Sequence, residues 1–185
     1  MTYATDSILR QCTAQMRIAS PLGPILLART AAGLAGAWFE RQKHHPATIE
    51  APQRDDDVLL RATAASLDAY FRGEDPVFDV RLDLQGSAFQ QAVWAELLRI
   101  APGATCSYGD IARRLGTPAA SRAVGTAVGR NPVSIIVPCH RVVGSTGALT
   151  GYAAGIDRKI ALLRLEAEAA GRRGAKVGST QLELH

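Results

Sequence analysis

Cysteine is scarce in this chain, and its scarcity argues against two kinds of site. The 185 residues include three cysteines, Cys12, Cys106 and Cys139. An odd number at wide spacing provides no disulfide framework, and no pair has the short spacing of zinc ligands. His44 and His45 lie far from any cysteine in the sequence. We therefore expect no metal site and no cofactor.

Long apolar runs are absent as well. No stretch approaches the roughly 18 apolar residues of a membrane span, and residues 1–6 contain no basic region followed by an apolar run. We therefore expect a soluble cytoplasmic protein in a reducing compartment, close to the nucleoid if the cell is bacterial. The formal net charge of +4 is compatible with nucleic-acid binding but too small to argue for it alone.

The first part of the sequence predicts a small α/β domain over residues 1–85. Apolar runs at 25–28 and 34–39, each introduced by turn residues, predict strands of a small antiparallel sheet. Apolar residues at helical spacing across 58–71 predict a helix. The near-alternation of apolar and polar residues at 77–82 predicts another strand.

The rest of the sequence predicts a mostly helical domain over residues 86–170. Ser87 begins its first helix through a capping box. Two short helices joined at Gly116 form a helix-turn-helix candidate, so we expect a winged-helix-like arrangement. A last helix covers 157–170, and residues 171–185, with few large apolar side chains, predict a flexible tail.

Residues 138–141 carry the clearest chemistry in the chain. They place the thiol of Cys139 beside the imidazole of His140, where the apolar run 133–137 predicts the end of a strand. A cysteine attacks as the thiolate; nearby positive charge lowers its pKa and an adjacent base activates it. Neighbours on an extended segment point to opposite faces, so His140 needs a turn or a bridging water to act on the thiol. The alternative is a buried structural cysteine, the commoner role of a cytosolic thiol.

Glu166 is a candidate third member of this site. It follows Leu162 by four residues on the last predicted helix, so it lies toward the apolar face. A carboxylate in that position needs a partner. It could orient His140 in a Cys–His–acid relay, or instead form a surface salt bridge with Arg158, Lys159 or a nearby arginine.

The segment before the cysteine has two further features. Its second short helix, about 119–128, consists largely of small residues, which let another backbone approach closely. Residues 107–141 contain five arginines and a single acidic residue, Asp110. An ordinary solvated surface explains such an excess of positive charge equally well. Asn131 begins either a plain turn or a hinge that fixes the Cys139 segment against the helix.

Motifs in a fixed order extend these observations to a family. They occupy 89–94, 107–112, 122–125, 131–132, 136–142, 151–152 and 158–163. This ordered set, which covers about residues 86–166, resembles the O6-alkylguanine-DNA alkyltransferases, a family of DNA repair methyltransferases. A lone Pro-Cys-His-Arg motif would be suggestive, whereas the ordered set is highly specific.

The resemblance implies a reaction that each molecule performs once. Cys139 would accept the alkyl group from guanine O6, and from thymine O4, in duplex DNA, and the product would be a stable thioether. Glu166, His140 and a water would draw the proton from Cys139, and Asn131 would be the hinge. This activity is that of a methylated-DNA–protein-cysteine S-methyltransferase.

The resemblance also implies how DNA is held. Tyr108 would donate to guanine N3, or crowd the 3′ phosphate and promote nucleotide flipping, and Arg122 would fill the vacated stack. The residues implied to face the minor groove are Ala120, Ser121 and Gly125. Tyr152, with the backbone near Val142 and Ser145, would shape the guanine pocket.

Physical arguments support the same picture. An atom inside a duplex cannot meet a buried thiol, so the nucleotide must be extruded. Unstacking costs a few kcal/mol, which an inserted side chain helps to offset. The second short helix has no Asn or Gln to read bases in the major groove, which favours binding that is independent of sequence.

The sequence departs from the family pattern at two positions and leaves alternatives open. Ala153 stands where many relatives carry a hydroxyl, and Ala154 where several carry glycine. Vertebrate zinc ligands have no counterpart here, and Cys139 is kept where alkyltransferase-like proteins replace it. A non-catalytic lesion-binding protein and a cysteine hydrolase that turns over remain alternatives. We expect a monomer in solution, with cooperative assembly on DNA and the preferred alkyl group left open.

Overall fold

A computed structural model describes residues 9–74 and 77–182, with the side chains of the last helix described as far as Arg172. Residues 1–6 and the last three residues of the predicted tail lie outside the described residues. The elements are β1 (Ala14–Ile18), β2 (Ile25–Arg29), β3 (Leu34–Phe39), α2 (Val58–Phe71), α3 (Ala88–Leu97), β4 (Cys106–Ser107), α4 (Tyr108–Arg114), the 3-10 helix η1 (Pro118–Ala120), α5 (Ser121–Gly129), the 3-10 helix η2 (Cys139–Arg141), β5 (Val142–Val143) and α6 (Ile156–Leu182).

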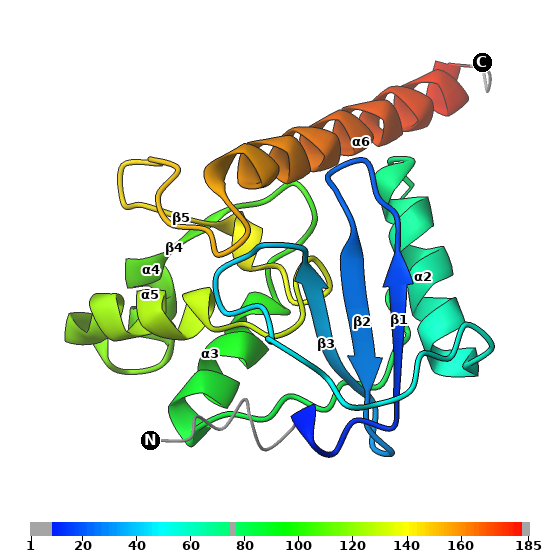
Figure 1. The fold of residues 1–185 in the computed structure, drawn as a ribbon. Coiled ribbons are helices and arrows are strands. Elements are labelled where there is room, and N and C mark those ends of the chain that lie inside the picture. The colour runs from blue at the N-terminus through cyan, green and yellow to red at the C-terminus, as the bar shows by residue number, and fades with distance from the viewer. Residues whose placement is uncertain (1–8, 75–76, 183–185) are drawn as a thin grey trace.

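The first three strands form an antiparallel sheet in the order β1-β2-β3. Helix α2 packs against β1 and β2, while α3, α4 and α5 lie on the other side of the molecule and α6 runs across one end of both (Figure 1). The predicted fold class is therefore confirmed. One cluster of buried apolar side chains runs from the sheet through α3 and α5 to α6. This continuous core fixes the carboxyl-terminal helices against the sheet.

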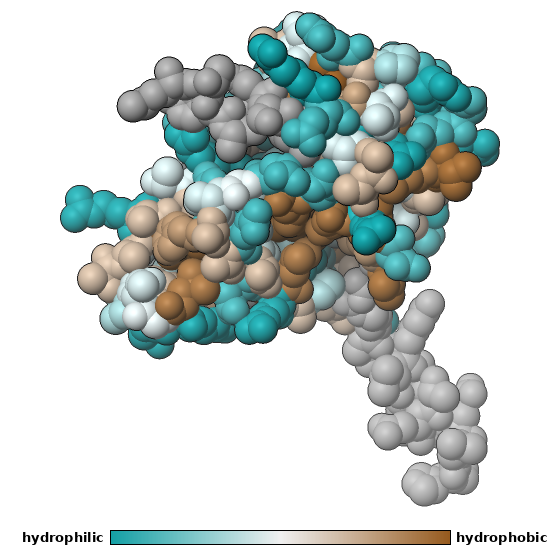
Figure 2. Space-filling model, turned by 90° about the horizontal axis from the view of Figure 1, so that it is seen from below, coloured by the Kyte–Doolittle hydropathy of each residue, from teal (hydrophilic) through white to brown (hydrophobic). Residues whose placement is uncertain are grey.

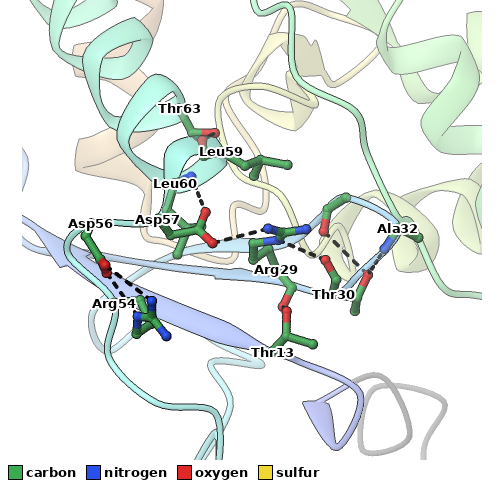
Figure 3. A network of polar contacts seen from close by, with 11 residues as sticks. Thr13, Arg29, Thr30, Ala32, Arg54, Asp56, Asp57, Leu59, Leu60 and Thr63 are labelled. Carbon is green, nitrogen blue, oxygen red and sulfur yellow. Dashed lines mark hydrogen bonds and ion pairs between the residues drawn. The ribbon is translucent and has the colours of Figure 1, made fainter.

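Helix α2 is anchored to the sheet at its amino end. The Asp57 carboxylate accepts from the Leu60 N–H at 3.0 Å as an N-cap, and also receives Arg29 Nη1 of β2 at 3.2 Å. Figure 3 shows both contacts, with Thr13 and Thr30 beside Arg29. An N-cap contributes about 1 kcal/mol, and here the same carboxylate also fixes where α2 lies on the sheet. The helix bounds match the prediction for 58–71.

Two capping boxes start the helices that carry the second part of the chain. Ser87 caps α3 with Gln90, as predicted, and Ser107 caps α4 with Asp110. The indole N–H of Trp94 donates to the Ala127 carbonyl at 2.9 Å and ties α3 to α5. Helices α4 and α5 form the predicted helix-turn-helix, although α5 is preceded by the 3-10 turn η1 rather than starting directly after Pro118.

Two predicted strands are wrong. Within 77–82, only Leu82 forms a bridge, to Leu34, so this segment is an extended connection. Within 133–137, Val133 bridges to Ala37 and the following residues form a buried turn. An apolar run indicates burial, and burial alone does not distinguish a strand from a turn enclosed by the core.

The last helix is longer than predicted. It begins at Ile156 and continues to Leu182, so the segment 171–182 is helical where a flexible tail was expected. No proline interrupts this stretch, and alanine, arginine and lysine favour a helix enough to carry it past Gly171. Within the described side chains, Arg172 donates to the Gly73 carbonyl at 3.4 Å, which links this end of α6 to α2.

The surface is mixed in polarity. On the face in Figure 2, polar residues surround separate apolar groups. The large apolar residues that are exposed in the described chain are Val58, Val77, Leu98, Leu149 and Ile160. Across the described ranges, no helix is both long and apolar enough to cross a bilayer.

Candidate active site

A buried turn organises the cysteine. Asn131 Nδ2 lies 2.8 Å from the Val137 carbonyl oxygen and 3.0 Å from Cys139 Sγ, so one amide closes the turn and contacts the thiol. Ile135, inside this turn, has a φ of 71°. A β-branched residue in the left-handed region is strained by about 1–3 kcal/mol, and the buried surroundings hold it there. Asn131, the residue predicted as a hinge, therefore holds the turn and the Cys139 thiol together.

The thiol of Cys139 is protonated at rest. The residue is 5% exposed, and burial raises its pKa, partly offset by the Asn131 hydrogen bond and by the charge of Lys159. From the sequence, nearby positive charge was expected to lower the pKa of Cys139. That suggestion is wrong because burial of the thiol outweighs the positive charge of Lys159, while the Arg141 guanidinium pairs with Glu166. A base is then needed to form the thiolate.

His140 lies next to Cys139 in the chain and contacts Glu166. The turn η2 places it in the fully buried core, where its Nε2 contacts Glu166 Oε1 at 2.7 Å. Burial lowers the pKa of His140, with Glu166 opposing the shift, so the ring is neutral near pH 7. Because a carboxylate only accepts, the ring proton is assigned to Nε2. Nδ1 is buried and has no partner among the described residues, so its lone pair is available for a proton.

Glu166 receives more donors than the sequence suggested. Arg141 Nε and Nη2 each donate at 2.9 Å, the Gly103 N–H donates at 3.0 Å, and the Tyr70 hydroxyl donates at 2.8 Å. These hydrogen bonds and the adjacent positive charges hold the pKa of Glu166 far below its usual range against the effect of burial. The carboxylate therefore stays charged and orients His140 rather than taking its proton.

Lys159 and Tyr108 hold the loop that follows β5. The buried Lys159 Nζ donates to the carbonyls of Val142 at 2.5 Å and Thr150 at 2.9 Å. The Tyr108 hydroxyl donates to the same Thr150 carbonyl at 3.1 Å. Burial raises the pKa of Tyr108, and the neighbouring Cys139 adds to the shift. Tyr108 is thus a permanent donor close to the thiol.

Tyr152 provides an unsatisfied donor at the same place. Its hydroxyl is buried near Ser134 and Cys139 but meets hydrogen-bond geometry with none of the described residues. Burial raises its pKa well above the ordinary value of 10. A buried hydroxyl without a partner is costly, so a ligand that accepts from it would be stabilised.

Most of the residues predicted to contact DNA line one surface hollow. It has a volume of about 560 Å³ and is lined by Tyr108, Gly109, Ser121, Arg122, Gly125, Thr126 and Ser145. The ring of Tyr108 lies against Gly125, about 3.7 Å from where a Cβ would stand. Ala120, in η1, is half-buried and does not line the hollow.

The arginines near this hollow do not form one patch. Arg113 pairs with Asp110, and Arg114 lies 3.9 Å from Glu96. Arg141 is buried, whereas Arg122 is exposed at the edge of the hollow. Of these four arginines, three are paired or buried, and Arg122 is in position to meet a ligand.

Comparison with known proteins places this geometry in a family. Residues 15–84 match the model of the 6-O-methylguanine DNA methyltransferase ribonuclease-like domain, and residues 88–168 match the DNA-binding domain of the same family. The chain belongs to the 6-O-methylguanine DNA methyltransferase family. The two matched ranges meet between residues 84 and 88, near the predicted boundary.

Individual relatives agree. The methylated-DNA–protein-cysteine methyltransferase of Mycobacterium tuberculosis is 49% identical over 149 residues, 80% of this chain and 89% of that protein. The protein of the same name from Methanosarcina acetivorans is also 49% identical, over 80% of this chain and 94% of its own. A crystal structure of Mycobacterium tuberculosis OGT in complex with DNA superposes with a TM-score of 0.78 at 46% identity, covering 84% of this chain and 94% of that one.

Of three further residues that contact the site, the sequence singled out two. Tyr70 contacts Glu166, Arg141 forms the ion pair with it, and Lys159 holds the loop around Val142. Arg141 belongs to the Pro-Cys-His-Arg motif and Lys159 was a candidate partner of Glu166, whereas the structure pairs Glu166 with Arg141 and Lys159 with backbone carbonyls. Tyr70 carried no signal beyond an apolar helical pattern.

Across the described residues, no group of three or more His, Cys, Asp or Glu side chains lies close enough together to bind a metal ion.

The structure also shows the surroundings of Ala153 and Ala154, the two departures from the family pattern. Ala153 accepts the Lys43 N–H through its carbonyl at 2.8 Å, and the methyl group of Ala154 is buried.

Proposed function

We propose that this chain repairs DNA by transferring the alkyl group of O6-alkylguanine to Cys139, once per molecule. The observation that carries the proposal is the buried set of Asn131, Cys139, His140 and Glu166, in which the neutral base has one ring nitrogen unpartnered. Family membership supports it. O4-alkylthymine, which presents the same alkyl–oxygen bond, is proposed as a second substrate.

The chemistry balances without a cofactor. His140, through a water at its bare Nδ1, takes the Cys139 proton and becomes an imidazolium paired with Glu166. The thiolate attacks the alkyl carbon, so that a sulfur–carbon bond forms as the carbon–O6 bond breaks. The guanine leaves as an anion and takes up a proton, with Tyr108 as the proposed donor at N3. The imidazolium then releases its extra proton through water, which restores Tyr108 and leaves His140 neutral. The thioether does not hydrolyse, so the protein is spent.

The burial of the Cys139 thiol implies that the target base must leave the duplex to react. Because Cys139 is 5% exposed, a guanine within a duplex cannot reach it and must flip out. The small residues around the hollow, Ser121 and Gly125, favour a minor-groove approach, with Ala120 alongside, and Tyr152, Val142 and Ser145 are proposed to enclose the base. A monomer that acts on double-stranded DNA in the cytoplasm is the proposed working form.

Intact-protein mass spectrometry tests the reaction. After incubation with a duplex that contains one O6-methylguanine, we expect the mass to rise by one methylene and to saturate at one per chain, with peptide mapping to Cys139. An unshifted mass with the duplex tightly bound would favour lesion binding without chemistry. Repeated product release from an unmodified protein would favour a hydrolase.

Arg122→Ala separates base extrusion from chemistry. Because Arg122 lines the hollow and not the thiol turn, the rate with free O6-benzylguanine is expected to stay unchanged. The rate with a duplex should fall roughly 10- to 100-fold, since unstacking of a few kcal/mol would lose its compensation. Single-turnover kinetics on both substrates measure this. Arg164→Ala, which removes an exposed arginine of α6, is the control; equal losses on both substrates would contradict the role of Arg122.

A further inference from the structure

The site extends beyond Glu166 into the amino-terminal part of the chain. Tyr70, at the carboxyl end of α2, donates its hydroxyl proton to Glu166 Oε1 at 2.8 Å. The same oxygen accepts the Nε2 proton of His140 at 2.7 Å. The Tyr70 oxygen is 3.5 Å from His140 Nε2, so the three polar groups are in mutual contact.

We propose that Tyr70 is a positioning residue for alkyl transfer: its hydroxyl fixes Glu166 Oε1 where that oxygen accepts the Nε2 proton of His140. Fixing this proton on Nε2 leaves Nδ1 as the free base. The proposal rests on the proposed function insofar as it concerns the rate of transfer. It adds a residue that lies 96 positions before Glu166 in the sequence.

The distribution of donors explains why Tyr70 matters. Oε2 of Glu166 is held by the Gly103 N–H and by Arg141 Nε. Oε1 is shared by His140, Arg141 Nη2 and Tyr70. Without Tyr70, Oε1 would lose its donor on the side of α2, and the carboxylate could tilt toward Arg141 and away from the imidazole.

Space next to the ion pair gives Tyr70 a second effect. One small cavity is lined by Tyr70 and Glu166 among others, and a second cavity, of about 200 Å³, is lined by Tyr70 and Arg141 among others. The Tyr70 ring, 5% exposed, is a wall of both. Glu166 does not line the second cavity, so the Tyr70 ring helps to keep water there from competing for the carboxylate, whose hydrogen bonds are stronger in a dry site.

The surroundings of Tyr70 keep its geometry constant. Its ring packs edge-on against Phe71, with centroids 5.6 Å apart, and lies 6.1 Å from the ring of Phe78. Asp57 and Arg29 fix the other end of α2 to the sheet (Figure 3). Burial, and then the negative charge of Glu166, raise the pKa of Tyr70 far above its ordinary value, so the hydroxyl is a donor throughout the working pH range.

A double-mutant cycle tests the proposal on the whole protein. Tyr70→Phe keeps the ring and removes the hydroxyl. We expect the rate of benzyl transfer from free O6-benzylguanine to fall about three- to tenfold, as when a hydrogen bond to a charged group is lost. In the Glu166→Gln background, the same change should alter the rate less than about twofold, because the two residues act as one unit. Thr63→Val removes another buried hydroxyl of α2, bonded only to Leu59 within the helix, and should be silent in both backgrounds.

A spectroscopic measurement without substrate completes the test. In ¹⁵N-histidine-labelled protein, the His140 Nε2 proton should exchange slowly with water in the wild type and in Thr63→Val, and faster in Tyr70→Phe. Equal rate losses in both backgrounds, or an Nε2 proton that exchanges as in the wild type, would overturn the role of Tyr70. If the wild type accepts no benzyl group, the proposed function fails, while the proton exchange still decides whether Tyr70 positions the relay.

Discussion

Replacing Cys139 with serine is expected to abolish alkyl transfer completely while leaving DNA binding intact. Asn131 Nδ2, which lies 3.0 Å from the sulfur, can donate to a serine hydroxyl as well, so the turn should keep its shape. A hydroxyl, however, ionises far less readily than a thiol and is a weak nucleophile at its free pKa. His140 is a neutral base of lowered pKa and cannot make up that difference.

The measurement combines two assays on one duplex containing O6-methylguanine. Intact mass should show no added methylene on Cys139→Ser, and a gel or anisotropy titration should give an affinity close to that of the wild type. Cys12→Ser, which changes a half-buried thiol outside the turn, is the matched control and should accept one alkyl group per chain. Transfer by Cys139→Ser would remove Cys139 from the centre of the mechanism, and loss of binding would show that the thiol also shapes the DNA site.

Parts of the fold were predictable because local signals and burial agree there. Helix α2 begins after Asp57 and ends before Gly73, residues whose chemistry starts and stops helices. β1 was missed, although Ala14, Met16 and Ile18 alternate with polar residues, because three separated apolar residues are a weaker signal than the continuous apolar runs at β2 and β3. The buried turn at 133–137 could not be foreseen, because its apolar sequence is equally suited to a strand.

The site residues also fall into those that the sequence predicted and those that it did not. Cys139, His140 and Glu166 were found because a thiol–imidazole pair and a carboxylate on an apolar helix face are unusual in sequence. Tyr70 was not, because its place in the apolar pattern of α2 explains it as a core residue. Only packing of α2 beside α6 brings its hydroxyl to the carboxylate. Packing between distant elements also reversed the expected pKa shift of Cys139, because it buries the thiol and burial raises its pKa.

Glu166→Gln is the second substitution with a large expected effect, on both rate and stability. Loss of the charge removes the partner that stabilises the His140 imidazolium, so transfer from O6-benzylguanine should slow roughly 10²-fold, as when general-base catalysis is disabled. The change also leaves the Arg141 guanidinium, 8% exposed, without a countercharge. Breaking a buried pair from one side costs about 3–5 kcal/mol, so the variant should unfold at markedly lower urea concentration at pH 7. Glu168→Gln, exposed two residues further along α6, is the control.

The pH dependence of stability distinguishes the two buried groups. The pKa of Glu166 is depressed in the folded state, so its contribution is fully present above the unfolded value of about 4.3 and is lost as pH falls toward the depressed value. The pKa of His140 is lowered by burial, so a second loss begins earlier, as pH falls through about 6.5, where the unfolded chain binds the proton. Urea denaturation from pH 7 to pH 3 should therefore show two stages of weakening in the wild type. In Glu166→Gln the stage below about pH 4.3 should be reduced; an equally steep acid loss in the variant would show that Glu166 is not the carboxylate that holds this core together.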